Sequence, residues 1–140
     1  MKYVFVVNRN AGKGSVAKKW TALESRVAEL FDDYTVVYDL APIVTDADVV
    51  VAVGGDGTVH YVLNHLMISN RRAALGVLPL GSGCDFARNF EMTDALAVLA
   101  RGETKAIDVG EIESAGNKIW FANVADAGMG AEVTRQMANH

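Results

Sequence analysis

Residues 49–59 read VVVAVGGDGTV, and this stretch decides the fold. The apolar run at 49–53 is typical of a strand that is buried on both faces of a parallel sheet. Three glycines follow within positions 54–57 and predict a tight turn, because glycine permits positive φ and a close approach of the backbone. Thr58 can cap a helix that begins there. A strand, a glycine-rich turn and a helix in direct succession predict an α/β protein.

Apolar runs alternate with helical patterns on both sides of this stretch. The expected strands are 3–7, 34–38, 48–53 and 74–80, and the expected helices are 15–30, 58–67 and 93–101, the last capped by Thr93. This alternation predicts an open, mostly parallel sheet with helices on both faces, which forms a domain over residues 1–105.

The alternation of strands and helices stops after residue 105. Residues 106–112 and 118–124 are expected strands, and the turn at 114–117 makes them a hairpin. A further helix is expected at 131–137. The segment 106–140 is therefore expected to be the start of an incomplete second domain of β structure.

Composition narrows the class of protein and its partners. The 140 residues are 51% hydrophobic and 21% charged, which is typical of a globular domain and not of a disordered chain. A net charge of −4 argues against a nucleic-acid partner, whose phosphates need cationic contacts. A single cysteine, Cys84, and the lack of a long apolar run predict a cytoplasmic protein.

Three of the expected strands end in glycine-rich turns, and ligands of open α/β sheets bind at such strand ends. The first turn, residues 8–15, contains Gly12 and Gly14. It matches the dinucleotide fingerprint only formally, because Gly12 lies several residues beyond its strand. A flexible turn that leads into a helix explains this segment equally well.

The second turn, residues 54–58, presents the first amides of a helix, which suit phosphate oxygens. Asp56 would repel a phosphate unless a divalent cation lies between them, or unless the carboxylate fixes a neighbouring donor. A tight turn in which Asp56 caps its own helix is the simpler alternative.

The third turn lies in residues 78–88, LPLGSGCDFAR. Gly81 precedes Ser82, whose hydroxyl is placed to bond a phosphate or a ribose. Asp85 and Arg88 stand three residues apart, so they can pair on a helix or contact a ligand. Cys84 is most simply a small buried residue.

Together, segments 54–59 and 78–88 resemble the catalytic domain of diacylglycerol kinases and of related lipid kinases, including sphingosine and ceramide kinases. Asn8 with Ala11 and Gly12, the IDVG of residues 107–110, and Phe121 with Asn123 match as well. The glycine–aspartate–glycine core alone also occurs in NAD kinases and phosphofructokinases. The resemblance implies an NAD kinase-like or diacylglycerol kinase-like nucleotide domain that uses ATP and Mg²⁺ to phosphorylate a lipid hydroxyl.

The turns and the resemblance together predict the residues of the nucleotide site. These are Asn8, Gly12, Gly54, Gly55, Asp56, Gly57, Thr58, Gly81, Ser82 and Asp85. Asp56 is expected to organise the phosphates and their metal, whose other ligands stay unassigned. The resemblance places the general base in the second domain, outside these residues.

Three features depart from the family pattern. Cys84 stands where the family commonly has Asn, and Tyr61 where bacterial members usually have Glu. The connection 39–48 is short where the family inserts a helix with a nucleotide-contacting Thr, for which Thr45 is not a convincing replacement.

Partners follow from the same resemblance. A lipid substrate implies transient contact of a cytoplasmic protein with the membrane surface. Apolar residues of the hairpin need cover, so a homo-oligomer or a missing C-terminal domain is expected.

One alternative to a lipid kinase is a nucleotide-binding fragment without catalytic activity. Another is a kinase of a soluble substrate such as NAD, against which segment 78–88 argues.

Overall fold

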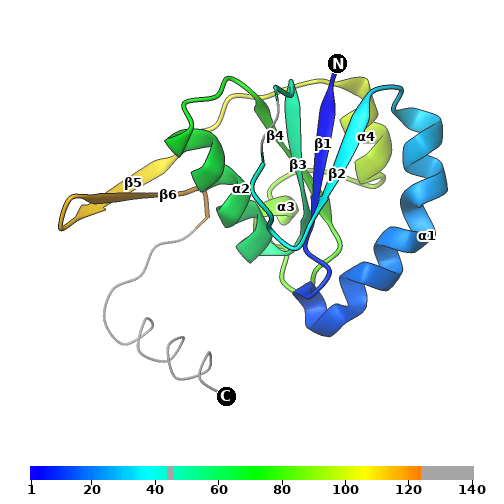
Figure 1. Cartoon of the computed structure of the whole chain (residues 1–140), viewed down its shortest axis with the longest axis horizontal. Coiled ribbons are helices and arrows are strands. Elements are labelled where there is room, and N and C mark those ends of the chain that lie inside the picture. Colours follow the sequence, from blue (N-terminus) through cyan, green and yellow to red (C-terminus); the bar gives the residue numbers. More distant parts are fainter. Residues whose placement is uncertain (44–45, 124–140) are drawn as a thin grey trace.

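The computed structural model describes residues 1–43 and 46–123 (Figure 1). Its elements, in chain order, are β1 (Tyr3–Val7), η1 (Ala11–Gly14), α1 (Ser15–Leu30), β2 (Tyr34–Tyr38), β3 (Val49–Gly54), α2 (Asp56–Ile68), β4 (Ala74–Pro79), α3 (Asp85–Arg88), α4 (Ala95–Arg101), β5 (Gly110–Ser114) and β6 (Asn117–Phe121). None of the helices in these ranges combines the length and the apolar character that a membrane crossing needs.

Four strands form a parallel sheet in the order β2-β1-β3-β4. Every residue of β1 and β3 is buried, because helices cover both faces of the sheet. On one face, Phe5 packs with Trp20 of α1 and Leu96 of α4. On the other face, Val6 packs with Val62 of α2 and Phe86 of α3. The predicted parallel sheet with helices on both faces is confirmed.

The strand register places the ends of three strands at one edge of the sheet. Val53 of β3 is opposite Val7 of β1 and Leu78 of β4. The segments that follow these strands therefore begin side by side, and they are the three glycine-rich turns.

Two predicted helix caps are wrong. Helix α2 begins at Asp56 after an extended Gly55, and Thr58 is 1% exposed within its first turn. The N-cap is Gly55, three residues before the predicted cap at Thr58, so the tight turn is three residues shorter than expected. Helix α4 is capped by Asp94, whose carboxylate accepts the amide of Ala97. The neighbouring Asp94 supplies the cap that was expected of Thr93, since either residue type is a good N-cap.

The hairpin is confirmed, with different limits. Pairing runs from Gly110 opposite Phe121 to Ser114 opposite Asn117, so residues 106–109 are outside β5. Ala115 and Gly116 form the turn with φ of 50° and 79°, which is the geometry that a two-residue hairpin loop requires. Residue 124, the helix expected at 131–137 and Thr45 lie outside the described residues.

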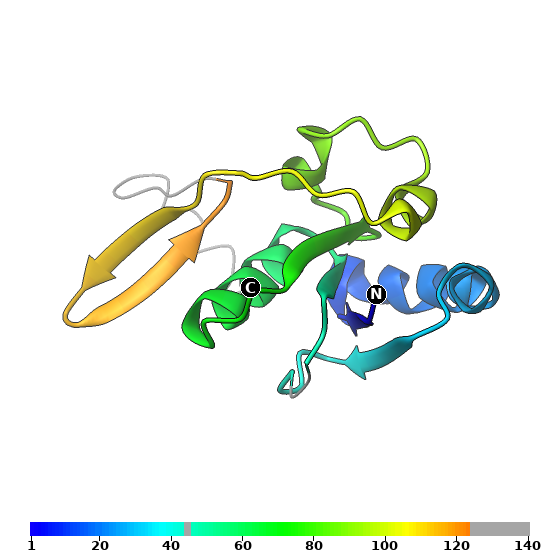
Figure 2. The same cartoon turned by 90° about the horizontal axis from the view of Figure 1, so that it is seen from above.

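The hairpin forms a second sheet that lies beside α2 (Figure 2). Asn64 of α2 holds it there: its Oδ1 accepts the amide of Trp120 at 3.0 Å, and its Nδ2 donates to the Trp120 carbonyl at 2.8 Å. Ile112 and Ile119 remain 44% and 50% exposed. The apolar exposure expected of the hairpin is therefore present at these two residues.

Candidate functional site

The first glycine-rich turn lies against the other two at the carboxyl edge of the sheet. A Cβ on Gly12 would lie 3.6 Å from the amide nitrogen of Ser82 in the third turn. Asn8 donates its backbone amide to the carbonyl of Val53 at 3.1 Å and its side-chain amide to Thr58 Oγ1 at 3.3 Å. The three turns thus form one continuous surface.

The second and third turns pack backbone against backbone. A Cβ on Gly55 would lie 2.6 Å from the carbonyl oxygen of Gly83, and one on Gly81 would lie 2.5 Å from the amide nitrogen of Gly55. The amides of Leu80 and Gly81 both donate to the carbonyl of Gly54, at 3.1 and 3.0 Å. No side chain larger than hydrogen fits between these segments.

The expectation that these glycines supply positive φ is wrong for the second turn. None of Gly54, Gly55 and Gly57 has a positive φ. A Cβ on Gly54 would lie 2.3 Å from Thr58 Oγ1, so this glycine is also required by close packing. In the first turn, by contrast, Gly12 and Gly14 have φ of 59° and 83°. Conformational freedom is needed there.

Asp56 links the second turn to the third. Its carboxylate oxygens accept the backbone amides of Asp85 and Phe86, each at 2.9 Å, and its own amide donates to the carbonyl of Gly83 at 3.0 Å. Asp56 therefore fixes neighbouring donors at the start of α3, as one of the alternatives held. The alternative that it caps its own helix is wrong, since α2 has no side-chain cap.

The start of α2 leaves one position open. The amides of Asp56, Thr58 and Val59 have backbone acceptors. Within the described chain the amide of Gly57 has none, and a Cβ at this exposed position would meet nothing within 4 Å. Gly57 thus combines a helix-start amide with free space where a side chain would lie.

The third turn brings Ser82 and Cys84 to a hollow of about 370 Å³ that Gly81 and Arg88 also line. Asp85 and Arg88 form an ion pair, which was one of the two alternatives for these residues, and both side chains are largely exposed. The Cys84 sulfur lies 3.4 Å from the carbonyl oxygen of Gly81. Burial raises the pKa of this thiol, so it stays protonated and can donate to that carbonyl.

Lys19 is a candidate site residue that the sequence does not indicate. It lies on α1, and its Nζ donates to the carbonyl of Leu80 at 3.0 Å, directly before the third turn. A single Lys on a helix carries no local signal, because its target is 61 residues away in the sequence. Its ammonium adds positive charge to the surface that the turns form.

Several contacts hold the start of the short connection that follows β2. The Arg9 guanidinium forms a salt bridge with Asp39 and stacks 4.8 Å from the centre of the Tyr38 ring. The hydrogen bond from Arg9 holds the pKa of Asp39 below its usual value. Tyr61 then donates its hydroxyl to the carbonyl of Leu40 at 2.8 Å. Tyr61 therefore packs α2 against this connection.

A second hollow, of about 280 Å³, opens beside Gly57. Its walls come from the start of α2, from α3 and from the end of the hairpin: Asp56, Gly57, Val59, His60, Leu63, Phe86, Phe121, Ala122 and Asn123. Mostly apolar walls with a few polar groups are typical of sites for small molecules. We call it the acceptor hollow.

The comparison with protein families bears directly on this arrangement. The model of the diacylglycerol kinase catalytic domain matches residues 2–112, which include all three turns. The chain belongs to this family. The diacylglycerol kinase domain match starts before β1 and ends within β5, so it covers the whole sheet and every predicted site residue.

Named relatives in the family are kinases. A protein of Cronobacter sakazakii named "Probable lipid kinase YegS-like" is 36% identical over 96 residues, which are 64% of this chain and 31% of that protein. A diacylglycerol kinase of Bacillus subtilis is 35% identical over 92 residues, 62% of this chain and 29% of that protein. The chain thus spans about a third of the length of these curated relatives.

A solved structure confirms the fold. The crystal structure of a diacylglycerol kinase from Bacillus anthracis superposes with a TM-score of 0.67 at 24% sequence identity. The superposition covers 84% of this chain and 45% of that chain.

Proposed function

We propose that this chain is the nucleotide-binding part of an ATP-dependent lipid kinase. The observation that carries the proposal is the convergence of three glycine-rich turns at one edge of the sheet, with Gly57 beside open space. Amides at a helix start carry partial positive charge that suits phosphate oxygens. The Lys19 ammonium supports the same ligand from α1.

The proposed nucleotide contacts come from all three turns. We place the phosphates against residues 54–58, and the remaining contacts on Asn8 and Gly12 of the first turn and on Gly81, Ser82 and Asp85 of the third. In phosphoryl transfer the protein mainly positions the phosphates and balances their charge. A backbone surface held together by close glycine contacts suits that task, because it does not reorganise when charge develops.

Mg²⁺ fits this arrangement through Asp56. Each oxygen of the Asp56 carboxylate accepts one backbone amide and keeps further acceptor capacity. Mg²⁺ in kinases is commonly held by one or two carboxylates together with substrate phosphates. Mg²⁺, when bound, would neutralise negative charge between the carboxylate and the phosphates.

The acceptor hollow supports a substrate with an apolar body and a hydroxyl end. Val59, Leu63 and Phe86 give it apolar walls, while Asp56 and Gly57 also line it. In the proposed reaction the lipid hydroxyl oxygen bonds to the γ-phosphorus, the bond from that phosphorus to the β,γ-bridging oxygen breaks, and ADP leaves. The hydroxyl proton passes to a base that we place in a β domain beginning near residue 106.

Such a reaction would take place at the cytoplasmic face of a membrane, where ATP and lipid meet.

The second candidate is nucleotide binding without catalysis. Two facts favour it for this chain alone: the chain spans about a third of its relatives, and two hairpin isoleucines are exposed.

Two measurements test the proposal. In denaturant titrations, Mg-ADP at 100 times its Kd should raise the free energy of unfolding by about 2.7 kcal/mol. An unchanged free energy would contradict nucleotide binding. Radiolabelled ATP, offered with lipid vesicles or with NAD, then separates the candidates: label in lipid supports the lipid kinase, label in NAD supports a soluble substrate, and binding without transfer supports the non-catalytic alternative.

A further inference from the structure

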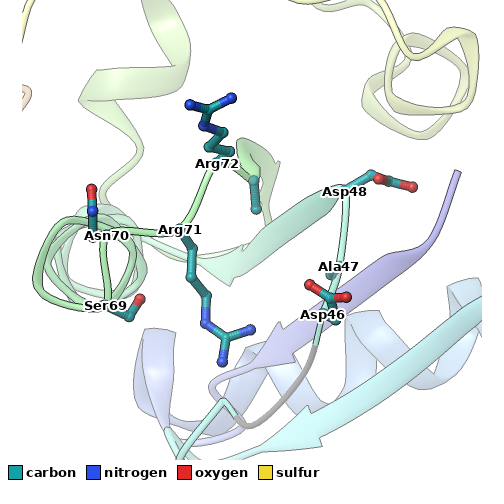
Figure 3. A pocket seen from close by; sticks show the side chains of 8 residues that line it. Asp46, Ala47, Asp48, Ser69, Asn70, Arg71 and Arg72 are labelled. Atoms are coloured by element: carbon teal, nitrogen blue, oxygen red, sulfur yellow. The ribbon is translucent and has the colours of Figure 1, made fainter.

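The end of α2 farthest from the glycine-rich turns carries two exposed apolar side chains and then two arginines. Met67 and Ile68 are 41% and 71% exposed. Arg71 and Arg72 are exposed in the turn that leads to β4. We call these four residues the α2–β4 corner. A hollow of about 760 Å³ opens beside it, at the amino ends of β3 and β4 (Figure 3).

The helix end holds these groups in a fixed arrangement. Asn70 adopts a left-handed conformation with φ of 48°. Its amide donates to the carbonyl of Met67 at 3.3 Å, and the amide of Arg71 donates to the carbonyl of Leu66 at 3.2 Å. These two bonds are the Schellman motif, which folds the chain back against the last helical turn. The arginine pair therefore begins next to the turn that carries Met67 and Ile68.

Both arginines of the corner lack an ion pair within the described residues. Four other arginines there each have one: Arg9 with Asp39, Arg26 with Asp94, Arg88 with Asp85, and Arg101 with Glu103. Asp46 and Asp48 line the same hollow as the corner arginines. Asp48, however, accepts the backbone amide of Lys2 at 2.7 Å, and Figure 3 shows Arg72 pointing away from both carboxylates. Neither guanidinium therefore has a salt-bridge partner within the described residues, and that of Arg72 is directed away from the carboxylates of the hollow.

We propose that the α2–β4 corner docks on the surface of an anionic lipid bilayer. Exposed apolar side chains beside cationic ones bind the membrane interface, because buried apolar area and attraction to anionic lipids add. Guanidinium groups suit lipid phosphates, which they can contact with two parallel hydrogen bonds. With a net charge of −4, the chain as a whole does not attract an anionic surface, so the attraction must be local.

The proposal rests on the proposed function, since a lipid kinase must meet a membrane. Helix α2 has 13 residues and is about 20 Å long, and it runs from the glycine-rich turns to the corner. The corner and the acceptor hollow lie at opposite ends of α2, so both can reach one bilayer only when α2 lies along its surface.

Co-sedimentation of the 140-residue chain with vesicles tests the contact. Vesicles of phosphatidylcholine with phosphatidylglycerol should bind the chain more tightly than phosphatidylcholine alone, and added salt should weaken the difference. Arg71→Gln with Arg72→Gln should lower binding roughly 30-fold, the equivalent of about 2 kcal/mol for two cations near an anionic surface. Met67→Ser with Ile68→Ser should lower it roughly tenfold or more.

Matched controls and a separate readout make the outcome decisive. Arg101→Gln and Leu30→Ser change an exposed cation and a 40% exposed apolar residue elsewhere, and should bind as the wild type does. Equal binding to both vesicle types, or corner variants that bind like the wild type, would overturn the proposal. The proposal would also be overturned if the corner residues caused only self-association of the chain, observed without vesicles. Stabilisation by Mg-ADP in the absence of lipid tests the proposed function independently, and the corner variants should retain it.

Discussion

At the scale of single residues, Gly55 and Gly57 have different reasons to be glycine. A Cβ on Gly55 would strike the backbone carbonyl of Gly83, whereas a Cβ on Gly57 would meet only open space. Gly57→Ala should therefore keep or slightly raise the free energy of unfolding, since alanine favours a helix by about 0.5–1 kcal/mol. It should also weaken Mg-ADP binding by placing a methyl group where the phosphates are proposed to lie.

Gly55→Ala is the contrasting variant. It should lower the free energy of unfolding by about 1–3 kcal/mol, the usual cost of overpacking, because backbone must move to admit the methyl group. Denaturant titrations with and without Mg-ADP give both quantities for each variant. A Gly57→Ala chain that binds Mg-ADP as tightly as the wild type would remove Gly57 from the nucleotide site.

Asp56 is expected to matter for stability as well as for ligand binding. The Asp56 carboxylate accepts the backbone amides of Asp85 and Phe86. Asp56→Asn replaces one of these two acceptor oxygens with an NH₂ group, so one of the amides loses its acceptor. Leaving a half-buried donor unpaired costs about 1–3 kcal/mol. The free energy of unfolding without nucleotide should fall by this amount, while Asp32→Asn, in an exposed turn, should leave it nearly unchanged.

How far the sequence predicts individual residues depends on the distance to their partners. The Asp85–Arg88 pair is local, and it was one of two alternatives that their spacing of three residues allowed. The acceptor role of Asp56 was one of three alternatives, because its donors are 29 and 30 residues away in the sequence and only the pairing of β3 with β4 brings them close. The cap at Thr93 was mispredicted because the adjacent Asp94 competes for the same position, whereas the cap at Thr58 was mispredicted because α2 already begins after Gly55.

At the scale of elements, the periodic patterns predicted β1 to β4 and the long helices well, since burial on both faces of a sheet leaves a clear apolar run. The hairpin limits were less predictable, because β5 and β6 pair only with each other and are largely exposed. Nothing in the sequence indicated that Asn64 would dock β6 on α2. That contact joins residues 56 positions apart.

The Asn64 contact predicts a local effect on the hairpin. Asn64→Ala removes both hydrogen bonds to the backbone of Trp120, so the hairpin should separate from α2 while the four-stranded sheet stays intact. In native-state hydrogen exchange, the amide of Trp120 should exchange faster and the amides of β3 should not. Glu113→Gln, on the exposed strand β5, is the control. Unchanged protection at Trp120 would show that other contacts hold the hairpin.

At the scale of the whole molecule, the two sheets differ in how well they are covered. The parallel sheet has helices on both faces, whereas the hairpin touches α2 along one side and exposes Ile112 and Ile119, which are paired across its strands. An exposed two-stranded sheet with apolar residues offers a surface for another chain. This exposure is the physical basis for expecting either self-association or a further domain.

We predict that the 140-residue chain self-associates through these isoleucines. Ile112→Thr with Ile119→Thr keeps β-branched residues in both strands but replaces apolar surface with hydroxyl groups, so the hairpin should persist while the association weakens. Sedimentation velocity over a range of concentrations should show a wild-type sedimentation coefficient that rises with concentration and a double variant that stays monomeric. Leu30→Ser, at an exposed helix end, should behave as the wild type does. A wild-type chain that is monomeric at every concentration would show that exposure of the hairpin alone does not drive association, because two half-exposed isoleucines bury too little area to offset the entropy that association costs.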